Sequence, residues 1–476
     1  MRLYNTLTRQ IDELDPIQKG EIKLYACGLT VYDYTHIGHL RKYSLDDVLV
    51  RTLRHTGLKV TFVQNVTDVG HLASDADTGE DKLEKGAKKY GKTVWDIAHE
   101  FEDYFFRSMD LMGNLRPDVS CRATEHIPEQ IALVQKLEEK GFTYVIEGDG
   151  VYFDTSKFPT YGELAKLNLD EQKAGARVDV VPGKRNPADF ALWKFERPGE
   201  NRAMSWESPW AKRGFPGWHI ECSAMAMKYL GEQFDIHTGG IDHVPVHHTN
   251  EIAQAEAATG KHPFVKYWVH HNHLQVNGEK MSKSLGNFFT IDDVLQKGFS
   301  PQALRLLFLT GHYRSQMNFT WENLEGAEKS WQKLARMMVS FREETDRQML
   351  SEEKLKKLDE YRSRFFSYME DDLKTPEAVA VMYEVMKSNV PSTDKYDLLR
   401  DFDEVLGLGL AKLTPESLAA AAPKTSVSPE LQALLDQRQA AREAKDWKLA
   451  DELRQKILTA GFEVLDTAGG QQLQPK

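Results

Sequence analysis

The sequence predicts an α/β fold, in which a doubly wound parallel-sheet (Rossmann-type) domain is interrupted by an inserted domain and followed by all-α C-terminal domains. Three observations predict this fold. A strand–helix–strand pattern occupies the first 70 residues, a second one runs from 234 to 276, and apolar residues recur at helical spacing after 301. Between the two strand–helix–strand patterns, residues 113–225 alternate short strands and turns, which indicates the insertion.

The first pattern begins with a strand from Ile22 to Cys27. A loop through Thr35 leads into a helix, for which Gly57 supplies the stop signal. The helix is predicted by apolar residues at helical spacing: Leu45, Val48, Leu49 and Leu53. The next strand starts at Val60. Two strands joined through a helix run parallel, so this unit is the start of a parallel sheet.

The later elements are read in the same way. Residues 71–90 are rich in charge and poor in apolar side chains, which predicts a surface insertion, and a helical pattern returns from 94 to 112. The second part of the sheet is then expected as strand 234–237, a tight turn at Gly239–Gly240, helix 247–258 and strand 268–276.

These patterns divide the chain into five parts. They are the sheet domain (1–112 and 226–300), the inserted domain (113–225, which contains Cys222), a helical bundle (301–413), a linker rich in Ala, Pro, Ser and Thr (414–429) and a small C-terminal region (430–476) that begins with a charged helical pair.

Composition excludes several classes of protein. No apolar run approaches the eighteen residues of a transmembrane helix, and the N-terminus lacks an apolar signal region. Three cysteines in 476 residues cannot form a disulfide framework, so we expect a reducing, cytoplasmic compartment and no membrane partner. The net charge of −11 argues against indiscriminate nucleic-acid binding, but it is compatible with a local basic face that reads one RNA.

The first chemical motif is Thr35–His39, which reads Thr-His-Ile-Gly-His and lies between a strand and a helix. The start of a helix offers free N–H groups and a positive dipole to an anion. Gly38 lets a bulky group approach the backbone, and His36 and His39 can donate to phosphate oxygens. Two surface histidines at a helix cap are the simpler alternative.

The second motif, Lys280–Ser284, reads Lys-Met-Ser-Lys-Ser on a glycine-flanked loop. Lys280 and Lys283 are compact charges that suit a clamp on a triphosphate. A solvated basic loop is the alternative, and it would be preferred if this motif stood alone.

A third set of residues has the chemistry of zinc ligands. Cys27 ends the first strand, Cys222 lies far along the chain, and His247 and Glu251 are four apart on a predicted helix, so they share one face. Spacing alone favours a different interpretation, with one buried structural cysteine, one buried core cysteine and a surface His–Glu pair.

Together the first two motifs resemble the signature pair of the class I aminoacyl-tRNA synthetases, and neither departs from the usual form. With the third set, the chain resembles the cysteinyl-tRNA synthetases over nearly its whole length. That resemblance implies one zinc ion per chain, bound by Cys27, Cys222, His247 and Glu251, while Cys121 has no counterpart. Zinc would select the cysteine thiolate over the serine alcohol, which is a poor ligand.

The resemblance also implies the reaction and its participants. L-Cysteine and ATP, accompanied by Mg²⁺, would give cysteinyl-adenylate, and the cysteinyl group would pass to tRNA(Cys); the family is typically monomeric. The implied roles are phosphate handling by His36, His39, Lys280 and Lys283, further ATP contacts by Gly38, Gly240 and Asp242, and a cysteine pocket with Thr67, Trp218 and His237. Core packing or a turn is the alternative for Asp242, Thr67, Trp218 and His237.

The tail is similar to the anticodon-binding end of the same family. Its expected tRNA contacts are Arg438, Arg442, Lys445 and Trp447, because an aromatic ring among cations can stack on an unpaired base. Composition alone would favour a solvated charged helix.

Two rival functions remain. One is the paralogous cysteine ligase of mycothiol synthesis, which joins cysteine to an amino sugar and lacks the long tail. The other is a non-catalytic RNA-binding paralogue, against which the intact lysines and histidines of the two motifs argue. The segment Asp68–Lys82 and the surroundings of His247 also depart from the usual family pattern.

Overall fold

We describe the protein from a computed structural model. It describes residues 1–70, 81–167, 181–344, 346–347, 349–416, 418, 429–459, 462–467 and 470–475. The expected segment 71–90 and the expected linker 414–429 therefore lie partly outside the described residues. In the described part of the chain, no helix has both the length and the apolar character needed to cross a lipid bilayer.

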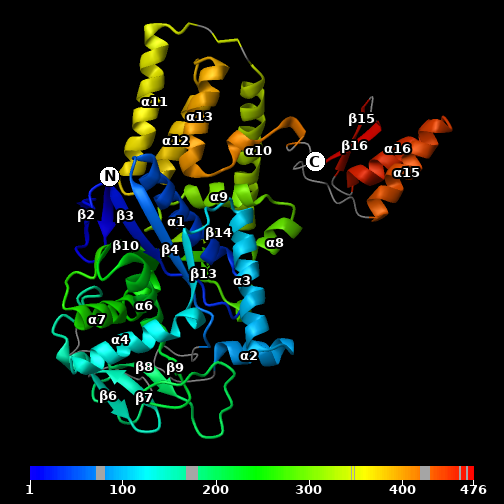
Figure 1. Ribbon diagram of the computed structural model, residues 1–476. Coiled ribbons are helices and arrows are strands. Elements are labelled where there is room, and N and C mark those ends of the chain that lie inside the picture. The colour runs from blue at the N-terminus through cyan, green and yellow to red at the C-terminus, as the bar shows by residue number, and fades with distance from the viewer. Residues whose placement is uncertain are drawn as a thin grey trace.

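The centre of the molecule is a five-stranded sheet in the order β11–β10–β3–β4–β5, in which all neighbours run parallel. Its strands are β3 (Glu21–Ala26), β4 (Lys59–Val66), β5 (Val119–Arg122), β10 (Phe234–Gly240) and β11 (Val265–His271). Helix α1 (Ile37–His55) makes the crossover between β3 and β4, as predicted. The α/β class with a parallel sheet is confirmed (Figure 1).

The strand β10 is longer than the sequence predicted. Gly239 and Gly240 do not form a tight turn but are the last residues of the strand, paired with His270 and His271 of β11. A Cβ atom on Gly239 would lie 2.4 Å from the His248 ring, so glycine is required there by close approach of a side chain.

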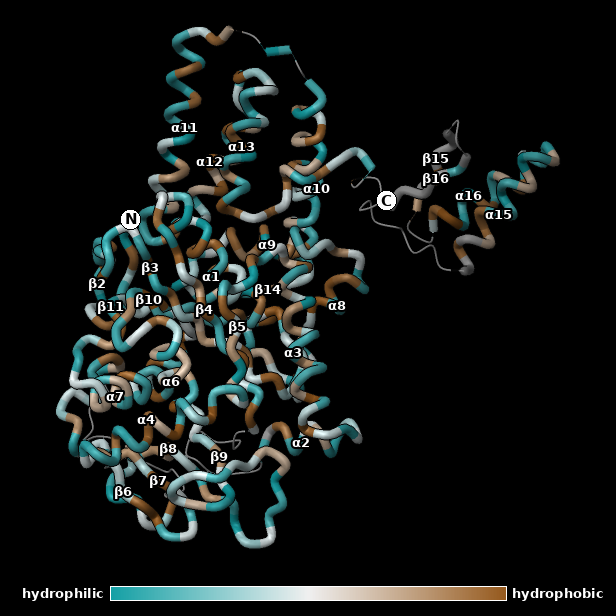
Figure 2. Tube along the Cα trace, viewed as in Figure 1, coloured by the Kyte–Doolittle hydropathy of each residue, from teal (hydrophilic) through white to brown (hydrophobic). Residues whose placement is uncertain are grey.

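Helices cover the sheet. Helix α6 (Trp218–Leu230) contacts β3 and β4 and also packs against α7 (His247–Thr259), while α1 contacts β4 and α9 (Pro301–Leu309). Buried hydrophobic residues of β4, α1, α9 and β14 (Met317–Phe319) belong to one core, and brown segments mark parts of it in the middle of the molecule (Figure 2). This core holds the carboxyl ends of β3 and β10 in fixed positions.

The region expected as an inserted domain contains an antiparallel sheet in the order β6–β7–β8–β9, with bounds Thr143–Ile146, Gly150–Phe153, Phe190–Phe195 and Gly214–Pro216. Three elements in the range 113–225 differ from the expected strands and turns. Strand β5 belongs to the central sheet, and α4 (Ile127–Glu139) and the start of α6 are helical. Helix α4 buries Ile127, Val134 and Leu137 at helical spacing.

Two helices follow β4. Residues 82–90, expected as part of a surface insertion, form α2 (Lys82–Tyr90), which packs on α3 (Val94–Leu111). The Asp81 carboxylate caps α2 by accepting from the backbone N–H groups of Leu83 and Glu84.

The second half of the chain is mainly helical, as predicted. From residue 301 it contains α9, α10 (Trp321–Glu343), α11 (Glu352–Glu370), α12 (Thr375–Lys387) and α13 (Ser392–Leu406), while α8 (Ile291–Gln296) lies just before, in the range expected for the sheet domain. Arg305 of α9 is fully buried and joins this bundle to the sheet domain: it donates to the Leu406 carbonyl at 2.7 Å and pairs with Asp47 of α1 at 2.5 Å.

Small sheets accompany these elements. Strand β1 (Arg2–Asn5) pairs with β2 (Gln10–Glu13), and β12 (Leu274–Val276) pairs with β13 (Glu279–Lys280) and β14. The tail contains the predicted helical pair, α15 (Pro429–Glu443) and α16 (Trp447–Thr459). It then ends in a β-hairpin, β15 (Phe462–Thr467) and β16 (Gly470–Pro475), which the all-α expectation did not include.

Candidate active site and metal centre

The first motif caps helix α1. His36 Nδ1 accepts from the backbone N–H groups of Gly38 and His39 at 3.1 and 3.3 Å, and the His36 and His39 rings stack with centroids 3.5 Å apart. Burial lowers the pKa of His36 to about 4 and that of His39 well below its ordinary value. Because Nδ1 of the neutral His36 ring is an acceptor, Nε2 carries the hydrogen and is available as a donor.

The second motif lies against the first. Lys283 forms an ion pair with Asp33 and lies 4.9 Å from the centroid of the Phe288 ring, which in turn contacts the His36 ring at 5.1 Å. The Ile37 N–H donates to the Phe289 carbonyl at 2.8 Å. The structure thus joins two motifs that are about 250 residues apart. Lys280 is exposed on β13.

The other residues expected to contact ATP differ in their surroundings. A Cβ atom on Gly38 would lie 2.9 Å from the Met281 methyl group, so the two motifs approach closely there and a larger residue would displace the end of the Met281 side chain. Gly240 has no such constraint, because a Cβ atom there would meet nothing within 4 Å. Asp242 is exposed and pairs with His273 at 3.2 Å.

The four expected metal ligands converge at the carboxyl edge of the sheet. Ligand atoms of Cys27, Cys222, His247 and Glu251 all lie within 4.8 Å of one another, and all four residues are buried. The two sulfur atoms are 4.0 Å apart, and His247 Nε2 lies 3.1 Å from Glu251 Oε1. Cys27 directly follows β3, Cys222 comes from α6, and the other two share one face of α7. Two thiols, an imidazole and a carboxylate are suitable ligands for tetrahedral zinc.

A second set of donors overlaps the first. It consists of Cys27, His237, His248 and Glu251, again within 4.8 Å of one another. The first set contains both thiols, which are the softer ligands and favour zinc. It therefore fits that metal better than the second set.

The charges in this cluster respond to one another. Burial alone would raise the pKa of Glu251, but His237 and His247 lower it to about 2. Burial opposes a charged His247, yet Cys222 and Glu251 raise its pKa to about 10. Burial also raises the pKa of the Cys27 thiol. The buried donors share a few protons among them, and a divalent cation can replace such protons.

Sequence reasoning missed the histidines that support the ligands. His219 Nδ1 lies 2.9 Å from His247 Nδ1, and His248 Nε2 lies 3.4 Å from Cys27 Sγ. His248 Nδ1 contacts His270 Nε2 at 2.7 Å. Partners of this kind orient metal ligands. The available signal was proximity in sequence, since His219 precedes Cys222 by three residues and His248 follows His247.

Of the three residues expected in the cysteine pocket, two contact the candidate metal ligands and one does not. His237 Nε2 contacts Glu251 Oε2 at 2.9 Å, and the ring of the half-buried Trp218 lies 4.7 Å from the His247 ring. Thr67 is buried, and its hydroxyl accepts from the Asn65 side chain at 3.1 Å, an arrangement that fits packing.

The expected tRNA contacts in the tail differ in their exposure to solvent. Trp447 is 59% exposed, and Lys445 is exposed in the turn between α15 and α16. Arg442 is half-buried. Arg438 is buried and donates to the Gln471 side chain of β16, so its position does not fit an RNA contact. The hairpin missing from the sequence-based expectation is the reason.

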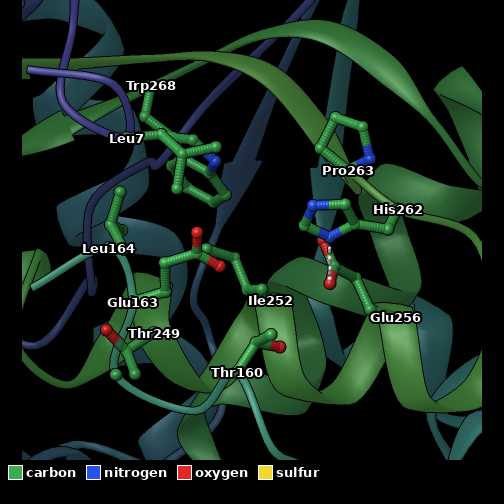
Figure 3. Close-up of a pocket in the computed structure, with 11 residues that line it drawn as sticks. Leu7, Thr160, Glu163, Leu164, Thr249, Ile252, Glu256, His262, Pro263 and Trp268 are labelled. Atoms are coloured by element: carbon green, nitrogen blue, oxygen red, sulfur yellow. Dashed lines mark hydrogen bonds and ion pairs between the residues drawn. The ribbon is translucent and has the colours of Figure 1, made fainter.

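A small cavity lies near the candidate metal ligands but is not the substrate site. Its walls include Leu7, Glu163, Ile252 and Trp268, and the His262–Glu256 ion pair lies at its edge (Figure 3). Its volume of about 10 Å³ has room for roughly one water molecule. It is far too small for an adenylate.

Comparison with known proteins identifies the family. Residues 13–329 match the family of "tRNA synthetases class I (C) catalytic domain", and residues 424–473 match the "Cysteinyl-tRNA ligase anticodon binding domain". The cysteine–tRNA ligase of Treponema denticola is 44% identical, with 98% of both chains covered. That of Thermus thermophilus is 42% identical, also with 98% of both chains covered.

Solved structures agree on the fold. A methionyl-tRNA synthetase of Mycobacterium tuberculosis, in complex with methionyl-adenylate, is 16% identical with a TM-score of 0.56 and covers 87% of this chain and 94% of its own. A LeuRS from Agrobacterium radiobacter gives 0.60 at 13% identity, with 87% of each chain covered. The full-length matches and the joined motifs show that the chain belongs to the cysteinyl-tRNA synthetase family, a group of class I aminoacyl-tRNA synthetases.

Proposed function

We propose that the chain activates L-cysteine with ATP, releasing pyrophosphate, and transfers the cysteinyl group from the adenylate to tRNA(Cys). One observation carries this proposal. The buried Cys27–Cys222–His247–Glu251 set lies at the same sheet edge as His36 and its partner loop, because Cys27 and the His36 cap both follow β3. A thiol-selective site is thereby adjacent to a phosphate-handling site.

Zinc is the metal that we propose for this set. The donors are two sulfur atoms, one nitrogen and one carboxylate oxygen within 4.8 Å of one another, which fits a four-ligand zinc site. When bound, zinc supplies a ligand position that a thiolate fills far better than an alcohol. A pocket that relied on shape alone would separate such similar substrates by only about 10–200-fold.

The residues of the chain divide the work of activation. His36 Nε2–H is a neutral donor for a phosphate oxygen, and the start of α1 adds the helix dipole. Lys283, and Lys280 on β13, neutralise the pyrophosphate as it leaves. Asp242 and Gly240 contact the nucleotide, whose phosphates bring Mg²⁺. Trp218 and His237 line the cysteine pocket beside the metal ligands.

The tail favours tRNA over an amino sugar as acceptor. The match of residues 424–473 to an anticodon-binding family supports this choice, as does the exposure of Trp447 beside Lys445. We propose that Trp447, Lys445 and Arg442 contact the anticodon region, and that the protein acts as a monomer in the cytoplasm.

Two assays test the proposal together. Cysteine-dependent exchange between ATP and pyrophosphate measures activation without RNA, and charging of a tRNA(Cys) transcript measures transfer. We expect both activities, with serine giving almost no exchange. Exchange without charging, combined with transfer to an amino sugar, would support the small-molecule ligase, while the absence of exchange would support a non-catalytic protein.

A further inference from the structure

Helix α2 carries lysines that the proposed chemistry does not use. Lys85 and Lys88 are exposed, and within the described part of the chain neither ammonium group has an ion-pair or hydrogen-bond partner. Lys89 is also exposed and donates to the Tyr90 hydroxyl at 3.0 Å. Three exposed lysines on one short helix are unexpected in a chain with a net charge of −11, and they point to an anionic partner.

The helix lies beside the loop that leads to His36. Leu83 is buried in the same small core as Val31, and a Cβ atom on Gly86 would come within 3.4 Å of the Tyr32 carbonyl oxygen. The hydrogen bond to Tyr90 raises the pKa of Lys89, and the negative charge of Asp33 acts in the same direction. Asp33 also pairs with Lys283. The lysines of α2 therefore stand beside the entrance to the phosphate-handling site.

An aromatic side chain stands at the same entrance. Tyr34 is 37% exposed and is two residues from His36. Its ring makes edge contacts with Phe101 and Tyr104 of α3, at 4.9 and 4.8 Å between centroids. It is therefore an exposed ring that is held in a fixed orientation.

The surface is also held rigidly. Asp81, which caps α2, forms a buried ion pair with Arg202, and the same guanidinium group donates to the Gly70 carbonyl at 2.9 Å. Arg202 in turn lies over the Phe215 ring at 3.7 Å. These contacts fix α2 against β9 as well as against α3, where it lies across the end of the longer helix (Figure 1).

We propose that α2 and Tyr34 bind the single-stranded 3′ end of the tRNA acceptor arm, with Lys85 and Lys88 contacting phosphates and Tyr34 stacking on a base. Lysines beside an exposed aromatic ring are typical of surfaces that bind single-stranded nucleic acid. This inference rests on the proposed function, because transfer requires the terminal adenosine to reach the adenylate beside His36. It adds an RNA contact far in sequence from the anticodon-binding tail.

The first test is the double variant Lys85→Gln/Lys88→Gln. The control is Lys19→Gln/Lys59→Gln, which removes the same charge from the opposite edge of the sheet, where β3 and β4 begin and where Lys59 pairs with Glu21 at 3.0 Å. Binding of tRNA(Cys) and of an acceptor-arm minihelix is measured across a salt series, next to pyrophosphate exchange without RNA.

For the α2 variant, we expect the slope of log affinity against log salt to fall by roughly 1–2 for both RNAs, because each lost phosphate contact contributes about 0.7–0.9. Exchange should stay within about twofold of the unmodified protein, since activation without RNA does not use this surface. Unchanged affinity and slope, or an equal loss in the control, would overturn the proposal. Failure of the underlying function is distinguishable, because the unmodified protein would then show no cysteine-dependent exchange.

The second test separates stacking from packing. Tyr34→Phe keeps the ring, and Tyr34→Leu removes it. We expect Tyr34→Phe to bind the minihelix normally and Tyr34→Leu to bind it roughly 5- to 150-fold more weakly, the range for loss of one base–aromatic stack. Loss of exchange in Tyr34→Leu, or equal binding by both variants, would overturn the assignment of Tyr34.

Discussion

Asp33 forms an ion pair with Lys283 and so competes with the pyrophosphate that we propose Lys283 binds. Asp33→Asn tests this competition. In the structure the Asp33 carboxylate accepts a hydrogen bond from the Tyr34 N–H at 2.8 Å. Asparagine has almost the same shape without the charge, and its amide oxygen can accept the same hydrogen bond. In the structure the two paired side chains are 23% and 46% exposed. In the proposed reaction, Lys283 leaves this ion pair in order to contact the pyrophosphate.

The exposure of the pair sets the size of the effect. Partly exposed ion pairs stabilise a protein by about 0.2–1 kcal/mol. Binding of ATP must supply this free energy to break the Asp33–Lys283 pair. Without the pair, the KM for ATP should fall by up to about fivefold, because 1.36 kcal/mol corresponds to a factor of ten. Lys283→Ala should instead lower the exchange rate by about 10²–10³, the scale for loss of one transition-state stabiliser.

The assay is cysteine-dependent pyrophosphate exchange at a series of ATP concentrations, at low and at high salt. The advantage of Asp33→Asn should shrink at high salt, since salt screens exposed pairs. Asp292→Asn is a matched control, because Asp292 pairs with Arg107 at 2.9 Å at similar exposure but on α8. A loss of about 10² in Asp33→Asn, comparable to that of Lys283→Ala, would refute the reasoning and place the carboxylate in the reaction itself.

Four further expectations follow from the same structure. Cys222→Ser should lose most bound zinc in elemental analysis while Cys121→Ser keeps it, because Cys222 belongs to the donor set and Cys121 does not. The unfolded chain binds a proton at His36 more readily than the folded one, so the free energy of unfolding should fall as pH falls from 6.5 to about 4, and His36→Asn should reduce that dependence in denaturant titrations at several pH values. Arg305→Met should destabilise the protein by about 1–3 kcal/mol in the same titrations, because the buried Leu406 carbonyl and Asn114 side chain lose their donor, while Asp47 keeps its ion pair with Arg51. Trp447→Ala should weaken tRNA binding by roughly 1–3 kcal/mol with an unchanged salt slope, because an indole neutralises no phosphate.

Sequence periodicity predicted the strands that are buried on both faces and the helices that bury one face. The crossover from β3 through α1 to β4 is an example, because a parallel sheet demands apolar strands and a helix between them. Helix α4 was missed: its buried residues are interrupted by charged ones, and the neighbouring turns dominated the interpretation. Helix α2 was missed for a similar reason, since only a few apolar side chains fix it to α3.

In the candidate site, the family resemblance predicted some residues, while the pairs formed by tertiary folding could not be predicted. The resemblance supplied the ligand positions, and the structure brings Cys27 and His247 together, although spacing alone favoured unrelated buried cysteines. Long-range pairs such as His219 with His247 or Asp33 with Lys283 leave no trace in local periodicity, because the residues are joined only by tertiary folding. Arg438 was predicted to be exposed because its helix is basic. The strand β16, which the sequence did not predict, covers it and accepts its hydrogen bond.

The proposed metal-ligand set also limits the stage of folding at which a metal can bind. Cys27 and Glu251 are 224 residues apart, and their side chains meet only after β3, α6 and α7 have packed. In a zinc finger the ligands are close in sequence, so the ion itself drives folding. Here loop closure must come first, and ligand pairs so distant form slowly. Zinc uptake during refolding should therefore lag behind the recovery of helical signal, and the bound metal would mark chains whose central sheet is already assembled.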